Sequence, residues 1–313
     1  MYWTVGNADR IVIRCARIAL PQERAKLCPP PGVRLAPGQH ENTERNPAMD
    51  IPRNDFKNDL RTGKTLLGLW LGLAETFSAE ICAGAGFDWL LIDGEHGPND
   101  LRSILAQLQA IEPYPSHAIV RPPQGDHVLI KQLLETGVQT LLIPMVETAE
   151  QAAGLVRAMR YPPAGIRGVG AALARASRWG RIQDYSAQAN DQMCLLLQVE
   201  TKLGYDNLDE ILAVDGVDGI FFGAADLAAS YGLLGQSNHP SIVQAIEAGL
   251  QKTCSAGKSG GVLCGDKAIV ERYFAAGARF IAVGVDALLL AAATTRLRQE
   301  YRPEPGGSSA ANY

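Results

Sequence analysis

The sequence predicts a single-domain α/β protein folded as a (β/α)8 TIM barrel. From Leu66 onward, eight short apolar runs alternate with longer helical patterns over roughly 235 residues, which is the size expected of such a barrel. The alternative is a doubly wound open sheet, which predicts a glycine-rich phosphate-binding turn after the first strand. The segment at that point, residues 72–77 (GLAETF), is not such a turn.

The expected strands are the eight apolar runs. Each is too short for a helix and lacks alternating polar residues, as in a parallel strand that is buried on both faces. In chain order they are residues 66–73, 87–93, 117–122, 140–146, 193–200, 218–223, 260–264 and 279–285.

The expected helices lie between these strands. The first begins with Ser78 as a cap, and the second is capped by Asn99 or Asp100 and stopped by Pro113. In chain order the helical patterns are residues 78–86, 99–113, 127–137, 148–162, 207–214, 241–257, 268–277 and 286–301.

Residues 1–48 differ from the rest of the chain. They carry a net charge of +3 against −7 for the remainder, hold 6 of the 18 prolines and sustain no helical or strand periodicity. Such a segment buries too little apolar surface to offset its ordering entropy. We expect either a disordered arm or a translation start at Met49, and we favour the second. The expected organisation is an extension over residues 1–48, a barrel over residues 49–303 and a flexible tail over residues 304–313.

Composition narrows the class of function. The 29 Lys+Arg against 33 Asp+Glu give no basic excess, which argues against nucleic acid as a partner. No stretch approaches the ~18 uncharged apolar residues of a membrane span, and the chain opens with no convincing signal peptide. The six cysteines form no C-x-x-C pair and most lie in apolar runs, which predicts reduced thiols in a cytoplasmic protein.

Unusual polar residues gather where the expected strands end. In a barrel these ends and the loops after them carry the chemistry. Glu200 and Asp226 supply two oxygen ligands, which suit a hard cation such as Mg²⁺ or Mn²⁺ completed by waters and a chelating substrate. The same two acids are also compatible with a salt-bridged pair at the rim or, less well, with the acid pair of a glycosidase.

A histidine and an arginine accompany these acids. His96 titrates near neutral pH and lies in a glycine-flanked loop directly after a strand, which favours a role in proton transfer over a structural one. Arg121 is placed either to stabilise an oxyanion or a carboxylate, or to pair with Glu200 or Asp93. Imine chemistry needs a desolvated lysine at a strand end, and the nearest, Lys202, lies in a polar loop. We therefore expect no Schiff-base lysine.

Several long motifs resemble the HpcH/HpaI family of class II pyruvate aldolases. The resemblance covers about residues 55–290 and is specific, because motifs of more than ten residues occur in the family's order. Among them are AGAGFDWLLIDGEHGPND, KQLLETGVQTLLIPMV and RYPPAGIRGVGAALARASRWGRI. It implies reversible, metal-dependent cleavage of a 4-hydroxy-2-oxo acid to pyruvate and an aldehyde. The substrate implied most directly is 4-hydroxy-2-oxoheptane-1,7-dioate, which gives succinic semialdehyde in the catabolism of aromatic compounds; 2-keto-3-deoxy-L-rhamnonate and 2-keto-3-deoxy-glucarate are alternatives.

The resemblance also implies roles for single residues. Glu200 and Asp226 would hold Mg²⁺, Mn²⁺ or Co²⁺. His96 would be the general base, with Asp93 and Glu95 beside it and with Glu135 matching an acid that orients this histidine in relatives. The residues expected to contact substrate are Gln198, Arg121, Trp70, Leu263 and, through their backbone N–H groups, Gly223 and Ala225.

The resemblance also predicts an oligomeric assembly, and the sequence departs from the family pattern at two places. The resemblance implies a hexamer, a trimer of dimers that exchange the last helix, about residues 286–301. Ala224 stands where the family usually has proline, so the loop carrying Asp226 loses a fixed φ and we expect a modest loss of metal affinity. Residues 264–266 also differ near the aldehyde-facing position and leave the acceptor size open.

Two other classes of function remain as alternatives. A lyase of the citrate- or malyl-CoA type would need a basic patch for CoA, and the segment 165–181, with four arginines, is the one candidate. A non-catalytic barrel is the other alternative, and the intact set of Glu200, Asp226, His96 and Arg121 weighs against it.

Overall fold

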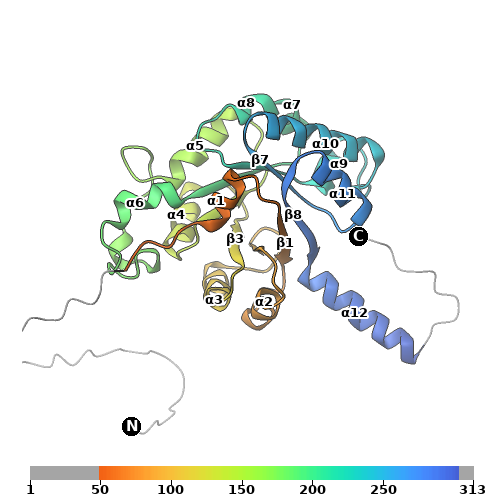
Figure 1. Cartoon of the computed structure of the whole chain (residues 1–313), viewed down its shortest axis with the longest axis horizontal. Coiled ribbons are helices and arrows are strands. Elements are labelled where there is room, and N and C mark those ends of the chain that lie inside the picture. Colours follow the sequence, from red (N-terminus) through yellow and green to blue (C-terminus); the bar gives the residue numbers. More distant parts are fainter. Residues whose placement is uncertain (1–48, 303–313) are drawn as a thin grey trace, which may run out of the picture. The chain divides into compact units, whose positions relative to one another are not determined.

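A computed structural model describes residues 49–302 of the chain, and the described part is a closed parallel barrel. The strands pair in chain order and β8 closes on β1, with helices around the outside (Figure 1). The expected barrel is therefore confirmed, and the open sheet is excluded. The expected extension over residues 1–48 and tail over residues 304–313 lie outside the described residues.

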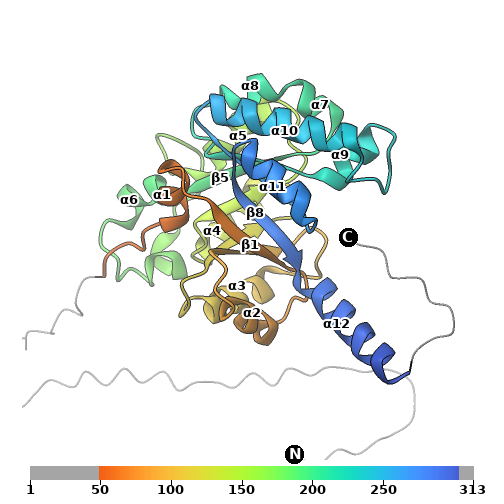
Figure 2. The same ribbon diagram turned by 45° about the vertical axis from the view of Figure 1, so that its right-hand side comes forward.

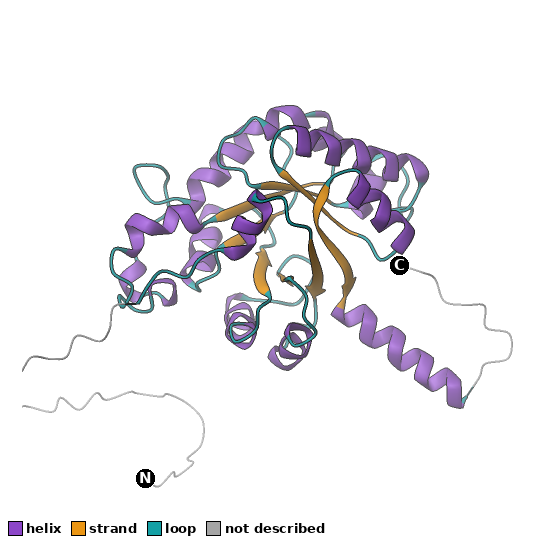
Figure 3. Cartoon of the chain, in the orientation of Figure 1, coloured by secondary structure: helices purple, strands orange, loops and turns teal. Residues whose placement is uncertain are grey.

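The eight strands coincide with the eight predicted apolar runs to within a few residues at either end. Most of their side chains are buried, as required of strands covered on both faces. Figure 3 shows the strands in orange and the helices in purple. The strands are β1 Leu66–Leu71, β2 Trp89–Asp93, β3 His117–Arg121, β4 Thr140–Ile143, β5 Cys194–Val199, β6 Gly219–Phe222, β7 Ser259–Leu263 and β8 Ala278–Val285.

All eight predicted helices form. Those helices are α2 Thr76–Ala83, α3 Leu101–Ile111, α4 His127–Glu135, α5 Ala149–Met159, α8 Leu208–Leu212, α10 Pro240–Ser255, α11 Lys267–Ala275 and α12 Asp286–Tyr301. Four short helices were not predicted: α1 Asp55–Arg61, α6 Tyr185–Gln192, α7 Lys202–Asp206 and α9 Ala224–Ser230.

The helix caps decide where these helices begin. Asp100 is the N-cap of α3, with a reciprocal hydrogen bond to Ser103, as one of the two expected alternatives had it. The predicted cap at Ser78 is wrong, because α2 begins two residues earlier and the Glu75 side chain accepts a hydrogen bond from the N–H of Thr76. A glutamate is an uncommon cap, so the sequence favoured the serine.

Aromatic side chains fill the inside of the barrel. Four rings contact one another in a closed circuit, with the centroids of neighbouring rings 5.4–6.4 Å apart: Trp70, Trp89, Phe280 and Phe221. Small residues make room for them, since a Cβ at Gly68 would lie 2.1 Å from the Trp89 ring. The barrel is therefore a packed core, and its chemistry is confined to the ends.

The two ends of the barrel are different. Helix α1 closes the amino end, where its Phe56 stacks on His117 at 5.3 Å. At the carboxyl end the polar residues of the strand ends and following loops form what we call the carboxyl rim. Helix α12 begins at this end, directly after β8, and runs away from the barrel (Figure 2). No helix among residues 49–302 is both long enough and apolar enough to cross a membrane.

Candidate active site at the carboxyl rim

Asp93, the last residue of β2, organises the loop that follows it. Its Oδ1 atom accepts hydrogen bonds from the backbone N–H groups of Glu95 (3.0 Å) and His96 (3.4 Å). Its own carbonyl accepts a hydrogen bond from the Asn99 side chain at 2.8 Å. The carboxylate thus fixes the backbone of the segment that carries the two predicted proton-handling side chains.

The same carboxylate holds Arg121 at the end of β3, its register partner. Arg121 donates from Nε and Nη2 to the two Asp93 oxygens at 2.9 and 2.7 Å, and its Nη1 lies 2.8 Å from Glu95 Oε2. Burial raises the pKa of Asp93, but the Arg121 hydrogen bonds and charge outweigh this and leave the pKa below its usual value. Of the two expectations for Arg121, pairing with Asp93 is therefore observed.

Trp70 belongs to this arrangement as well. Its indole Nε1 donates to Asp93 Oδ2 at 3.2 Å, and the Arg121 guanidinium lies 5.1 Å from the ring centroid. The tryptophan is 4% exposed. Its contact with substrate stays a prediction, and the contacts that the structure shows anchor Asp93 and Arg121.

His96 is the most accessible of the predicted catalytic groups. Its side chain is 67% exposed, and its Nε2 atom lies 3.8 Å from Glu95 Oε2. Burial raises the pKa of Glu95 above its usual value, although the charges of Arg121 and His96 oppose that effect. The imidazole and this half-buried carboxyl are thus adjacent groups at the rim, and both belong to residue types that transfer protons in active sites.

Glu200 lies at the rim one residue after β5, three strands along the barrel from β2, and is 1% exposed. Its Oε1 accepts a hydrogen bond from the backbone N–H of Met145 at 2.8 Å, and its Oε2 accepts one from the Gln198 side chain. Burial raises the pKa of Glu200 to about 7, despite these hydrogen bonds and with a further contribution from nearby carboxylates.

Asp226 is one of those carboxylates, in the first turn of α9. The turn approaches Glu200 closely, since a Cβ at Gly223 would lie 2.3 Å from Glu200 Oε2. Only glycine fits at this position without displacing Glu200 or the loop. The predicted pair of acids is therefore brought together.

The residues present fit a hard divalent cation. Two acids act on each other electrostatically at the edge of a buried site, and Gln198 Oε1 is buried without any hydrogen-bond partner in the described chain. Residues 49–302 contain no cluster of three or more His, Cys, Asp or Glu side chains arranged as metal ligands. Mg²⁺-type sites commonly take one or two carboxylates and complete the shell with water and substrate, so two acids suffice.

Two residue expectations can be compared with the hydrogen bonds of the structure. The N–H of Gly223 donates to the Val199 carbonyl at 3.2 Å, so a substrate carboxylate would have to share this donor or replace that carbonyl. Ala225 lies in the first turn of α9, whose amino end has no side-chain cap, and its contact with a substrate carboxylate stays a prediction.

The position of Glu135 bears on its predicted role. It ends α4, and because helices run antiparallel to the strands, it lies near the amino end of the barrel, away from His96. Its Oε1 is 3.9 Å from the buried Arg167 guanidinium. Glu135 therefore cannot orient His96 of its own chain. Leu263 ends β7 at the rim, and its predicted contact with the aldehyde part of the substrate across a subunit interface stays a prediction.

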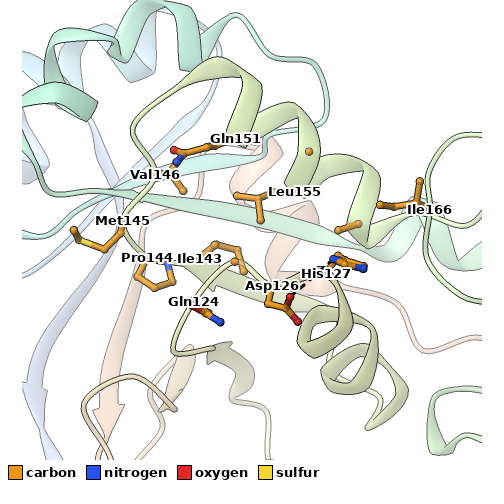
Figure 4. A pocket seen from close by; sticks show the side chains of 13 residues that line it. Gln124, Asp126, His127, Ile143, Pro144, Met145, Val146, Gln151, Leu155 and Ile166 are labelled. Carbon is orange, nitrogen blue, oxygen red and sulfur yellow. Dashed lines mark ion pairs between the residues drawn. The ribbon is translucent and has the colours of Figure 1, made fainter.

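A cavity of about 540 Å³ lies beside the rim, between the start of α4 and α5 (Figure 4). Its lining is mostly apolar, and two of its polar members, Asp126 and Gln151, already accept hydrogen bonds from backbone N–H groups near helix starts. The cavity contains none of the predicted catalytic groups, so the carboxyl rim remains the candidate active site.

Sequence comparison places this rim in a known group of enzymes. The family model described as HpcH/HpaI aldolase/citrate lyase matches residues 66–293. A hydroxypyruvate/pyruvate aldolase of Deinococcus radiodurans is 59% identical over 269 residues, 83% of this chain and 97% of the relative. A 4-hydroxy-2-oxo-heptane-1,7-dioate aldolase of Salmonella paratyphi B is 56% identical over 252 residues, 80% of this chain and 96% of the relative.

Comparison with solved structures gives the same family as the sequence comparison. A crystal structure of an HpcH/HpaI aldolase/citrate lyase family protein from Burkholderia cenocepacia has a TM-score of 0.76 and 42% identity, covering 80% of this chain and 99% of that one. The family match and the acids, histidine and arginine at the carboxyl rim together identify the class of protein as a carbon–carbon lyase. The chain belongs to the HpcH/HpaI aldolase family, and it is a class II pyruvate aldolase.

Proposed function

We propose that the protein cleaves 4-hydroxy-2-oxoheptane-1,7-dioate reversibly to pyruvate and succinic semialdehyde. The observation that carries the proposal is the meeting of Glu200, Asp226, Gln198, Glu95 and Arg121 at one rim. The 56% identity to a relative named for this substrate supports the choice. The reducing cytoplasm is the compartment we infer, consistent with the free thiols of the four described cysteines.

Glu200 and Asp226 would hold a divalent cation, Mg²⁺, Mn²⁺ or Co²⁺. When bound, it supplies a Lewis acid that polarises the 2-oxo group of the substrate. Burial makes the Glu200 carboxylate costly to ionise alone, which is the behaviour of a ligand that requires a cation beside it. Lys202, the lysine nearest a strand end, is exposed and paired with Asp206 at 2.5 Å, so imine formation is not part of the proposal.

The chain's own groups move the protons. His96 takes the proton from the C4 hydroxyl, a C=O bond forms at C4, and the C3–C4 bond breaks. The electron pair of that bond remains on the three-carbon fragment as an enolate, which takes a proton at C3 to give pyruvate. Arg121 stabilises the negative charge with the N–H groups not used by Asp93 and Glu95.

Leu263 and Trp70 would shape the space around the substrate, and Ala225 would offer its N–H to the carboxylate. Orientation of His96 by Glu135 would require a second subunit, because within one chain the two side chains lie toward opposite ends of the barrel. This fits the assembly we propose, a hexamer built from dimers that exchange α12.

A panel of donors and acceptors tests the proposal. In the aldol direction with Mg²⁺, Mn²⁺ or Co²⁺, we expect pyruvate to be consumed fastest with succinic semialdehyde, slower with lactaldehyde and tartronate semialdehyde. A preference for either of the latter would move the assignment to the deoxy-sugar acids. His96→Gln should abolish turnover, whereas the exposed His127→Gln should leave it unchanged.

A second candidate differs in the donor. The 59% identical relative is named hydroxypyruvate/pyruvate aldolase, which supports hydroxypyruvate in place of pyruvate as the nucleophile precursor. The same panel repeated with hydroxypyruvate separates the two candidates by the ratio of their kcat/KM values.

A further inference from the structure

We propose that Met145 is a positioning residue: its backbone N–H, presented from a left-handed conformation, fixes the Glu200 carboxylate for cation binding. The inference rests on the proposed function, since it takes Glu200 to be a ligand. Met145 lies on the loop from β4 to α5, between Pro144 and Val146 (Figure 4). Its N–H donates to Glu200 Oε1 at 2.8 Å.

The backbone of Met145 is in a conformation that its residue type disfavours. Its φ is 57°, in the left-handed region where glycine is at ease and a side chain crowds the following carbonyl. Such conformations persist when the surrounding structure imposes them, and they concentrate at functional sites. Met145 combines such a conformation with a direct contact to the rim acid Glu200.

The surroundings that impose the conformation come from the segment that carries Glu200. The N–H of Val146 donates to the Gln198 carbonyl at 3.1 Å, and the Asn207 side chain donates to the Glu147 carbonyl at 2.8 Å. A Cβ at Gly204 would lie 2.6 Å from the Val146 carbonyl oxygen. The loop and residues 198–207 are therefore joined as one unit on both sides of the Met145–Glu200 hydrogen bond.

The side chain of Met145 contributes little to this arrangement. It is 51% exposed and lies beside the cavity between α4 and α5. Because the backbone makes the contact, a substitution acts on Glu200 through the φ angle that the new residue tolerates. Glycine keeps the N–H and accepts the angle, whereas a β-branched residue resists it.

Calorimetric titration of the metal-free, full-length protein with Mn²⁺ tests the inference. Met145→Gly should bind Mn²⁺ within about threefold of the wild type. Met145→Val should bind it about tenfold or more weakly, the effect of losing a hydrogen bond to a charged group. Asp184→Val is the matched control, since Asp184 has a φ of 51° at the distant start of α6. It should lower the melting temperature without changing the affinity.

Met145→Val could weaken Mn²⁺ binding by impairing folding, and a variant of the backbone alone separates the two effects. Replacing Met145 by its α-hydroxy acid puts an oxygen where the N–H was, and should weaken Mn²⁺ binding to the same degree with the melting temperature nearly unchanged. Wild-type affinity in this variant overturns the role of Met145 and leaves the proposed function intact. Failure of the wild type to bind Mn²⁺, Mg²⁺ or Co²⁺ overturns both.

Discussion

At the scale of single residues, Asp93 holds the rim together. It connects β1, β2 and β3 through Trp70, its own loop and Arg121, and it is 4% exposed. Removing one partner of a buried ion pair leaves a charge without compensation, which is more costly than the pair itself is worth.

Asp93→Asn is therefore expected to destabilise the fold by about 3 kcal/mol and to lower kcat, since Arg121 and the His96 loop lose their anchor. Urea unfolding and steady-state kinetics measure the two effects. The control is Asp59→Asn, which removes an exposed pair with Lys64 and should leave the unfolding free energy almost unchanged. Equal effects of the two substitutions would refute the role of Asp93.

Ala224 gives a second prediction at this scale. It is the first residue of α9, where proline is favoured because its φ is preset and its missing N–H has no partner in the helix. Ala224→Pro should tighten Mn²⁺ binding by roughly threefold and stabilise the fold by up to about 1 kcal/mol. Titration with Mn²⁺ checks this, and unchanged or weaker binding would contradict it.

Some of these site residues could be predicted from the sequence and others could not. Glu200, Asp226, His96 and Arg121 could be predicted because strand ends of a barrel meet at one rim. Met145 could not, since a backbone N–H carries no signal in the residue type and a positive φ after proline has no sequence mark. Similarity to relatives does not say which subunit supplies a side chain, so the sequence left open whether Glu135 acts within one chain.

At the scale of elements, the strands were predictable because burial on both faces demands continuous apolar runs. The short helices α1, α6, α7 and α9 were missed, since five to eight residues give too little periodicity. A local signal did exist for α1, where the Asn54 side chain caps the N–H of Lys57.

Helix α1 gives a prediction about acid stability. Burial under Phe56 lowers the pKa of His117 from 6.5 to about 4. The unfolded chain therefore takes up this proton first as the pH falls below about 6.5, and stability is progressively lost toward pH 4. The loss should be on the order of 2 kcal/mol, allowing for partial exposure of the ring.

His117→Gln should make the unfolding free energy less steep between pH 6.5 and 4.5, as measured by urea titration at several pH values. His127→Gln provides the control, because the His127 side chain is 68% exposed. Parallel pH profiles for the wild type and His117→Gln would show that His117 is not responsible.

At the scale of the whole molecule, α12 exposes an apolar surface to solvent within one chain. Leu288, Leu289, Leu290 and Leu297 are 47–55% exposed, and Phe77 on α2 is 70% exposed. Contiguous exposed apolar residues commonly mark protein–protein contacts. The surface is what exchange of α12 between two copies would bury.

Leu289→Glu should therefore reduce the mass in solution from that of a hexamer to that of smaller species. Size-exclusion chromatography with light scattering measures it, and Gln299→Glu on the same helix is the control. A wild-type monomer, or an unchanged mass in Leu289→Glu, would contradict the exchange.

The most direct test of the account is pyruvate release from 4-hydroxy-2-oxoheptane-1,7-dioate by metal-stripped protein, coupled to lactate dehydrogenase. We expect activity to be absent in EDTA, to return with Mn²⁺ or Mg²⁺ in the wild type, and to stay absent in Glu200→Gln at the same metal concentration. Turnover that persists in EDTA, together with trapping of the protein by borohydride and pyruvate, would contradict a cation held by Glu200 and Asp226.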